Sequence, residues 1–125
     1  MRLLLDTHIF LWAVQGNASL KPRVRRMMEA AEQIYVSAAS IWEIAVKARL
    51  GKIEASAADL VDAIEASGFL ELPVRARHAV RVADLPLHHT DPFDRLLVSQ
   101  AMVEPLRLLT VDTMLCQYSD LVTLV

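Results

Sequence analysis

Short apolar runs alternate along the chain with longer stretches in which apolar residues recur at helical spacing. Brief apolar runs bounded by turn residues favour buried strands, whereas recurrence every three or four positions favours amphipathic helices. The predicted strands span residues 2–5, 34–36, 69–74 and 107–111, and residues 121–125 form the last apolar run. The predicted helices span residues 8–14, 22–32, 37–50, 57–66, 75–85 and 92–103, with a short helix before the last run.

Turn and capping residues support these boundaries. Pro22 and Pro92 suit the first position of a helix, and Asp91 suits the N-cap before Pro92. Gly51 and Gly68 follow two of the predicted helices as stop signals. Strands that alternate with helices predict an α/β fold, a three-layer α/β/α sandwich around a mostly parallel sheet.

Length, charge and cysteine content narrow the class of protein. The 125 residues fit a single domain spanning residues 1–125. A net charge of -2 argues against a surface coated in basic residues for indiscriminate nucleic-acid binding. Cys116 is the only cysteine, which favours a reducing compartment. Asp6 and His8 interrupt the apolar amino-terminal run, so we expect a cytoplasmic protein with no membrane partner.

Four acidic residues carry the candidate chemistry: Asp6 after LLL, Glu43 within an apolar helix, Asp94 in HTDPFDRLL, and Asp112 closing LLTVD. Three of them lie where a strand passes into a loop or helix, or at the start of a helix, and α/β sheets bind ligands along that edge. Carboxylates that meet there would hold Mg²⁺ or Mn²⁺, because hard divalent cations prefer oxygen ligands. The pattern predicts metal-dependent hydrolysis of phosphodiester bonds.

Each acid also has an ordinary structural explanation. Asp6, Asp91 and Asp112 suit helix N-caps, and Asp94 suits the positive end of a helix dipole. Taken together, however, several acids at one sheet edge would repel one another unless a cation lay between them.

Glu43 has two further explanations within its own helix. It completes a capping box with Ser40 if the helix starts at Ser40 rather than Ser37. It also stands one turn before Lys47, at the spacing of a helical ion pair.

The chain resembles a known family at these same residues. Asp6 with Thr7, Glu43 in SIWEIAVK, the segment HHTDPFDRLLVSQA and the segment LLTVD resemble the PIN domain, and more closely the VapC-type toxins of type II toxin–antitoxin pairs. The resemblance runs from Leu3 to Val125. It implies a magnesium-dependent endoribonuclease, with Mn²⁺ as a substitute, that forms homodimers and is inhibited by a cognate antitoxin protein.

The resemblance also implies roles for the acids. Asp6 and Asp94 would hold the ion, Asp112 would contribute directly or through a water molecule, and Glu43 would bind a second ion or orient the attacking water. RNA would be cleaved by a metal-activated water. Asp91 is interpreted as a helix cap first and an outer-shell ligand second.

Neighbouring polar residues are candidates for supporting roles. The hydroxyls of Thr7 and Thr110 would orient a carboxylate or a water, or else make plain turn bonds. His88 and His89 are interpreted as loop residues that touch RNA, because an oxygen-rich magnesium site does not need imidazole.

Two basic residues stand close to the acids along the sequence. Lys47 and Arg95 would meet a substrate phosphate, although a salt bridge with a neighbouring acid is the favoured role for each. The alternative function for the whole chain is a noncatalytic metal-binding regulatory or protein-interaction module with a receiver-like or inactive PIN fold.

Overall fold

A single parallel sheet forms the centre of the molecule, in a computed structural model that describes all residues from Met1 to Val125. Its five strands lie in the order β3-β2-β1-β4-β5, and every neighbouring pair is parallel. The strands are β1 (Arg2–Leu5), β2 (Gln33–Ser37), β3 (Leu70–Leu72), β4 (Arg107–Thr110) and β5 (Val122–Leu124). The predicted parallel α/β sheet is confirmed.

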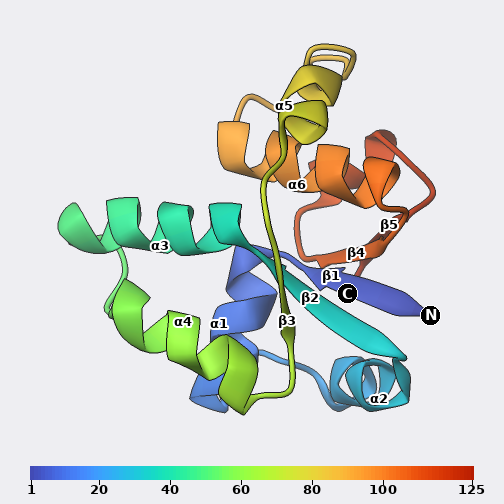
Figure 1. Cartoon of the computed structure of the whole chain (residues 1–125). Coiled ribbons are helices and arrows are strands. Elements are labelled where there is room, and N and C mark those ends of the chain that lie inside the picture. Colours follow the sequence, from blue (N-terminus) through green and yellow to red (C-terminus); the bar gives the residue numbers. More distant parts are fainter.

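Helices cover both faces of this sheet (Figure 1). On one side lie α1 (Thr7–Gln15), α2 (Pro22–Ala30), α3 (Ala38–Arg49) and α4 (Ala57–Ala66). On the other lie α5 (Ala76–Val82), α6 (Pro92–Val103) and the short 3₁₀ helix η1 (Thr113–Gln117). The three-layer sandwich is therefore confirmed. No helix combines the length and apolar character needed to cross a lipid bilayer.

The central strand β1 supplies side chains to both halves of the core. Leu3 and Leu5 point into the cluster under α1 to α4, whereas Leu4 points into the cluster under α5 and α6. All three leucines are fully buried. Complete burial of one such side chain contributes about 1.5–3 kcal/mol to folding. The uninterrupted apolar run of β1 is thus explained by its two covered faces.

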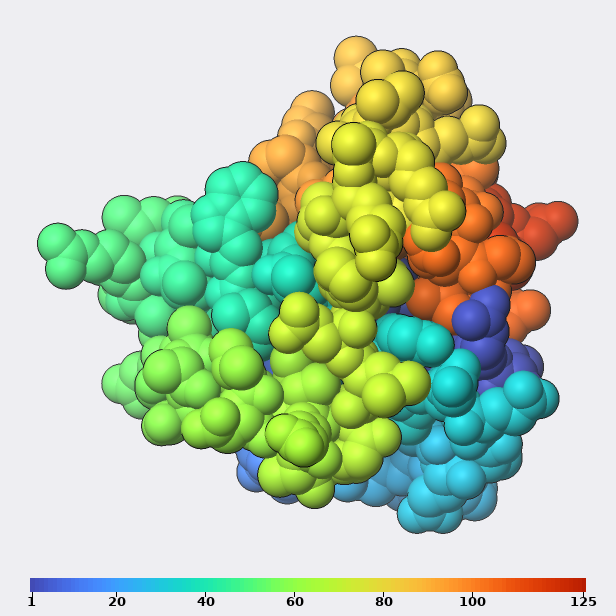
Figure 2. Space-filling model, in the orientation of Figure 1, coloured from blue at the N-terminus to red at the C-terminus, as the bar shows by residue number.

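Element boundaries differ from the sequence predictions at the edges of the molecule. The strand predicted over 69–74 is limited to Leu70–Leu72, because β3 is an edge strand that pairs only with β2. Figure 2 shows the yellow-green segment that contains β3 lying across the front surface, beside α3 and α4. The helix predicted over 75–85 ends at Val82.

The order of the strands creates a crevice beside β1. The chain passes from β1 outwards to β2 and β3, then crosses to β4 on the opposite side of β1. The connections leaving the carboxyl ends of β1 and β4 therefore diverge, and such a switch point is where open α/β sheets bind ligands. A backbone bond from Asp6 N to Leu109 O, 3.0 Å long, joins the two strand ends.

Candidate metal-binding cleft

A polar cleft lies at the carboxyl ends of β1 and β4, beside the amino end of α6. It encloses about 470 Å³, and only one of its ten lining residues is hydrophobic. The lining comprises Asp6, His8, Glu43, Lys47, His89, Asp91, Asp94, Val111, Asp112 and Thr113. The cleft thus brings together the four acids that the sequence analysis singled out, with Asp91 beside them.

Asp6 is both a helix cap and a wall of the cleft. Its Oδ1 accepts a bond from Ile9 N (2.8 Å), as an N-cap should, and its Oδ2 accepts one from the Thr110 hydroxyl (2.6 Å). Burial raises the pKa of the Asp6 carboxyl, although the Thr110 bond opposes that shift. Thr110 also accepts a bond from Asp112 N (3.1 Å). One hydroxyl therefore orients the first acid and fixes the backbone of the last.

Glu43 reaches the cleft from the second turn of α3. That helix begins at Ala38 with Ser37 as its N-cap, so the condition for a capping box between Ser40 and Glu43, a helix start at Ser40, is not met. Instead, Glu43 is buried and accepts a 2.6 Å bond from the Thr7 hydroxyl at Oε1. Its other oxygen pairs with the Lys47 ammonium, which confirms the predicted ion pair.

Asp91 and Asp94 occupy the amino end of α6 and behave differently. Asp91 is the predicted N-cap, since its Oδ1 accepts bonds from Phe93 N (2.8 Å) and Asp94 N (3.2 Å). Asp94 makes no such cap. Burial, followed by the charges of Asp91, Glu43 and Asp6, raises the pKa of the Asp94 carboxyl to about 7. The negative charges of these neighbouring acids therefore disfavour the ionised form of Asp94.

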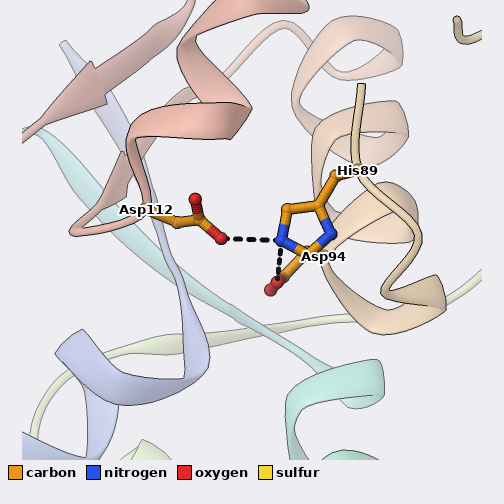
Figure 3. Close-up of side chains that lie close together, drawn as sticks. All are labelled: His89, Asp94 and Asp112. Carbon is orange, nitrogen blue, oxygen red and sulfur yellow. Dashed lines mark hydrogen bonds and ion pairs between the residues drawn. The ribbon is translucent and has the colours of Figure 1, made fainter. Parts of the chain in front are cut away.

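His89 joins the acids in a way that the sequence analysis missed. Figure 3 shows its imidazole between Asp112 and Asp94, and its Nε2 lies 2.7 Å from Asp112 Oδ2 and 3.6 Å from Asp94 Oδ2. Nδ1 accepts a bond from Asp91 N (2.9 Å), so in the neutral ring Nε2 carries the proton and donates to Asp112. The available signal was the position of His89 two residues before a helix N-cap.

Asp112 completes this side of the cleft from the turn after β4. Its Oδ1 accepts a bond from Met114 N (2.9 Å), which makes it the N-cap of η1. Its Oδ2 remains directed at His89. Potential ligand atoms of His89, Asp94 and Asp112 all lie within 4.8 Å of one another.

Two of the proposed substrate contacts lie outside the cleft. His88 packs its ring edge-on against Tyr118, with ring centroids 5.1 Å apart. Arg95 is buried and makes no salt bridge, so the ion pair predicted for it is wrong. Consecutive helical residues point about 100° apart, which turns Arg95 away from the direction of Asp94. Its guanidinium bonds to backbone carbonyls instead.

The donor set fits a hard divalent cation. Five of the residues that line the cleft carry carboxylates, and Lys47 is the only lysine or arginine in the lining. The bond with Glu43 is the main cause of the raised pKa of the Lys47 ammonium, so that charge is already engaged. The carboxyls of Asp6 and Asp94 have raised pKa values, and any proton that they hold is released when a cation binds. Oxygen donors of this kind suit Mg²⁺ and Mn²⁺.

Comparison with known proteins identifies the family. The PIN domain family matches residues 3–121. The chain belongs to the PIN domain family. The match covers all four acids and His89, and it excludes a receiver-like fold for this PIN domain. No curated protein matches the chain.

Solved structures share the fold of this PIN domain. VapBC2 from Rickettsia felis, bound to a DNA fragment from its promoter, aligns with a TM-score of 0.70 and 16% identity over 100% of this chain and 98% of that chain. A toxin–antitoxin complex from Klebsiella pneumoniae gives 0.67 and 18% over 97% and 95%. FitAcB from Neisseria gonorrhoeae gives 0.57 and 20% over 90% and 89%.

Proposed function

We propose that this PIN domain is a magnesium-dependent endoribonuclease that acts as the toxin of a toxin–antitoxin pair. The observation that carries the proposal is the gathering of Asp6, Glu43, Asp94 and Asp112 around one cleft. Two of these acids, Asp6 and Asp94, have raised pKa values, and carboxyls with perturbed pKa values in a cleft are typical of functional sites. The raised pKa of Asp94 supports a site built to receive a cation.

The four acids would play different roles in binding the ion. Asp6 and Asp94 would hold it, with Asp112 contributing directly or through a water molecule. When bound, a divalent cation lowers the pKa of water and neutralises charge on a phosphate group. Mn²⁺ would substitute for Mg²⁺. Glu43 would hold a second ion or orient the attacking water, and its bond from Thr7 keeps the carboxylate in place for either task.

Two positively charged or polar groups beside the acids favour a phosphate-bearing substrate. The Lys47 ammonium at the cleft wall would contact a phosphate oxygen of RNA once an ion neutralises Glu43. His89 would donate its Nε2 proton to a substrate oxygen in place of Asp112. Asp91 would remain a cap that contributes to the outer shell.

The proposed partner is a cognate antitoxin protein that blocks the cleft, and the proposed compartment is the cytoplasm. Support comes from the structural neighbours, whose descriptions name VapBC2, FitAcB and a toxin–antitoxin complex. We further propose a homodimer. Exposed apolar side chains on α3 and at its C-cap offer a surface for self-association, since Trp42 is 58% exposed and Leu50 is 62% exposed.

The direct test is cleavage of a diverse RNA pool by the purified chain. We expect cut ends to accumulate with Mg²⁺ or Mn²⁺, to disappear with EDTA, and to be absent with the Asp94→Asn variant in every buffer. A contaminating nuclease would still cut RNA in the Asp94→Asn preparation, so intact RNA with this variant excludes contamination as the source of the cleavage. Intact RNA with every divalent ion, from a folded wild-type protein, would contradict the catalytic proposal and leave an inactive PIN fold that only binds proteins.

Sedimentation velocity tests the dimer separately. A single dimeric species at micromolar concentration is the expected result, and the addition of an antitoxin should give a larger assembly. A monomer throughout that concentration range would contradict the dimer without affecting the catalytic proposal.

A further inference from the structure

Arg95 uses its buried guanidinium to fix the connection between α5 and α6. Its Nη2 donates to Val82 O and Leu85 O, each at 3.2 Å, and its Nη1 donates to Pro86 O at 2.9 Å. Val82 is the last residue of α5, where helical carbonyls lack partners within the helix, and Leu85 lies three residues beyond it. A cation is favourable at that helix end. Arg95 thus caps the carboxyl end of α5 and bonds to the start of the loop between α5 and α6.

Tyr118 extends the same set of bonds to the cleft. Its hydroxyl accepts a 3.1 Å bond from Arg95 Nη1 and a 2.9 Å bond from His89 N. The guanidinium carbon of Arg95 also lies 6.0 Å from the centre of the Tyr118 ring. Tyr118 follows η1, the element whose N-cap is Asp112. The Tyr118 hydroxyl therefore links η1, which Tyr118 follows, to α6 through Arg95 and to the loop that carries His89.

The imidazole of His89 is fixed as a result. With its backbone N–H held by Tyr118 and its Nδ1 accepting from Asp91 N, the ring has little freedom to turn. Its Nε2 then faces Asp112 and Asp94, as Figure 3 shows. Residues 83–91 lie outside any helix or strand, so side chains must supply the order that a regular element would provide.

We propose that Arg95 and Tyr118 are positioning residues that hold His89 in register with Asp94 and Asp112. Neither side chain lines the cleft, and both act through the loop that carries His89. The geometric part stands on the contacts alone, whereas the consequence for cleavage rests on the proposed nuclease function. A positioned N–H beside two carboxylates presents one defined donor to whatever occupies the cleft.

The test compares Tyr118→Phe with Tyr35→Phe. The first removes the hydroxyl that accepts bonds from Arg95 Nη1 and His89 N, and it leaves the direct 3.4 Å bond from Arg95 Nη1 to His89 O in place. The second removes a hydroxyl that bonds to exposed Gln33 on its own strand β2, and it is the matched control. Both variants keep their aromatic rings, so both should fold. Arg95→Lys, which keeps the charge but not the fork of donors, is the second test.

The first readout needs neither RNA nor metal. Amide exchange and imidazole ¹⁵N signals, recorded by NMR at one pH, report on the two bonds that fix the His89 ring. In Tyr118→Phe we expect the Asp91 amide, which bonds to His89 rather than to Tyr118, to exchange about tenfold faster. The His89 ring should also lose its single Nε2–H form. Tyr35→Phe should match the wild type on both measurements.

The second readout separates positioning from binding. With Mg²⁺ and RNA, Tyr118→Phe should lower kcat about tenfold and change KM less than twofold, because a loosened group costs rate when its geometry matters. An Asp91 amide and a His89 ring that remain as in the wild type would overturn the proposal. If wild-type protein cleaves nothing while the NMR contrast persists, the nuclease function fails and the positioning stands.

Discussion

The two ends of α6 carry acids in opposite electrostatic situations. At the amino end, burial and the charges of Asp91, Glu43 and Asp6 raise the pKa of Asp94 to about 7. At the carboxyl end, Glu104 has a lowered pKa, mainly because of its bond with His78 and then because of Arg77. The Arg77 guanidinium lies 2.8 Å from Glu104.

The helix dipole alone would predict the reverse. An acid in the first turn of a helix is stabilised as an anion, and an acid at the last turn is destabilised. Here the neighbours decide instead, since Glu104 has cationic and hydrogen-bonding partners and Asp94 stands among other acids. An acid that the fold leaves without compensation indicates where a ligand belongs, and an acid with its own partners indicates a structural joint.

The largest expected effect breaks the contrast at the cleft. Asp6→Asn and Asp94→Asn should each lower RNA cleavage at least about a hundredfold, because an amide keeps the size of the side chain but loses the charge that holds the ion. Glu104→Gln, at the other end of α6, should keep nearly wild-type cleavage. Rates measured with Mg²⁺, alongside circular dichroism, decide the matter. Full activity in either cleft variant would remove the proposed site.

The pH dependence of stability sharpens the same contrast. A raised pKa means that folded Asp94 keeps a proton that the unfolded chain has released, so its contribution is complete below about pH 4 and is lost as pH rises through about 7. With EDTA present, the free energy of unfolding should fall by about 2 kcal/mol between pH 5 and pH 8. Denaturant titrations measure this. A flat profile would show that Asp94 is compensated after all.

Substitutions at the two ends of α6 should change stability in opposite directions. At pH 8 without metal, Asp94→Asn should raise the melting temperature by about 4–8 °C, because it removes about 1–2 kcal/mol of repulsion. Glu104→Gln should lower it by a few degrees, since it leaves His78 and Arg77 without their anion. Calorimetry of both variants gives the direction of each shift in melting temperature. Shifts in the same direction would contradict the electrostatic distinction between the two ends of α6.

Removal of the metal should affect activity before structure. The leucine core does not involve the cleft, so exhaustive chelation should leave the circular dichroism spectrum unchanged. Addition of Mg²⁺ at ten times its Kd should then stabilise the fold by about 1.4 kcal/mol. This gain should disappear in Asp94→Asn and persist in Glu104→Gln. An unfolded metal-free protein would contradict the prediction.

The smallest expected effect concerns Asp91, the cap at the amino end of α6. Asparagine caps helices nearly as well as aspartate, so Asp91→Asn should change stability by less than about 0.5 kcal/mol. Cleavage should fall only a few fold. A folded but inactive Asp91→Asn would instead place this carboxylate among the ligands of the ion.

The sequence predicted which acidic residues would lie together better than it predicted their hydrogen-bond partners. Local signals sufficed for the caps Asp6 and Asp91, because a cap bonds within its own first turn. The ion pair between Glu43 and Lys47 was equally local. The bonds of Arg95 could not be predicted from local signals, because its partners lie on a loop and on Tyr118.

Contacts between distant segments explain the remaining differences. The strand order, which places β1 between β2 and β4, depends on packing across the whole chain. The bond between His89 and Asp112 was not predicted, because it spans 23 positions and leaves no periodic signal. Side chains whose neighbours are set by tertiary structure are therefore the ones for which sequence reasoning falls short.

The pairing of β1 with β4 also governs when the molecule becomes complete during synthesis. Thr110 lies 104 positions after Asp6, and yet the two share a hydrogen bond. A chain made at about 5–20 residues per second takes roughly 1–4 s to add residues 107–125. Until then β1 has an open edge, and the growing chain holds Asp6, Glu43 and Asp94 without Thr110 or Asp112. The cleft therefore comes into being only with the last strands, and an interrupted chain never acquires it.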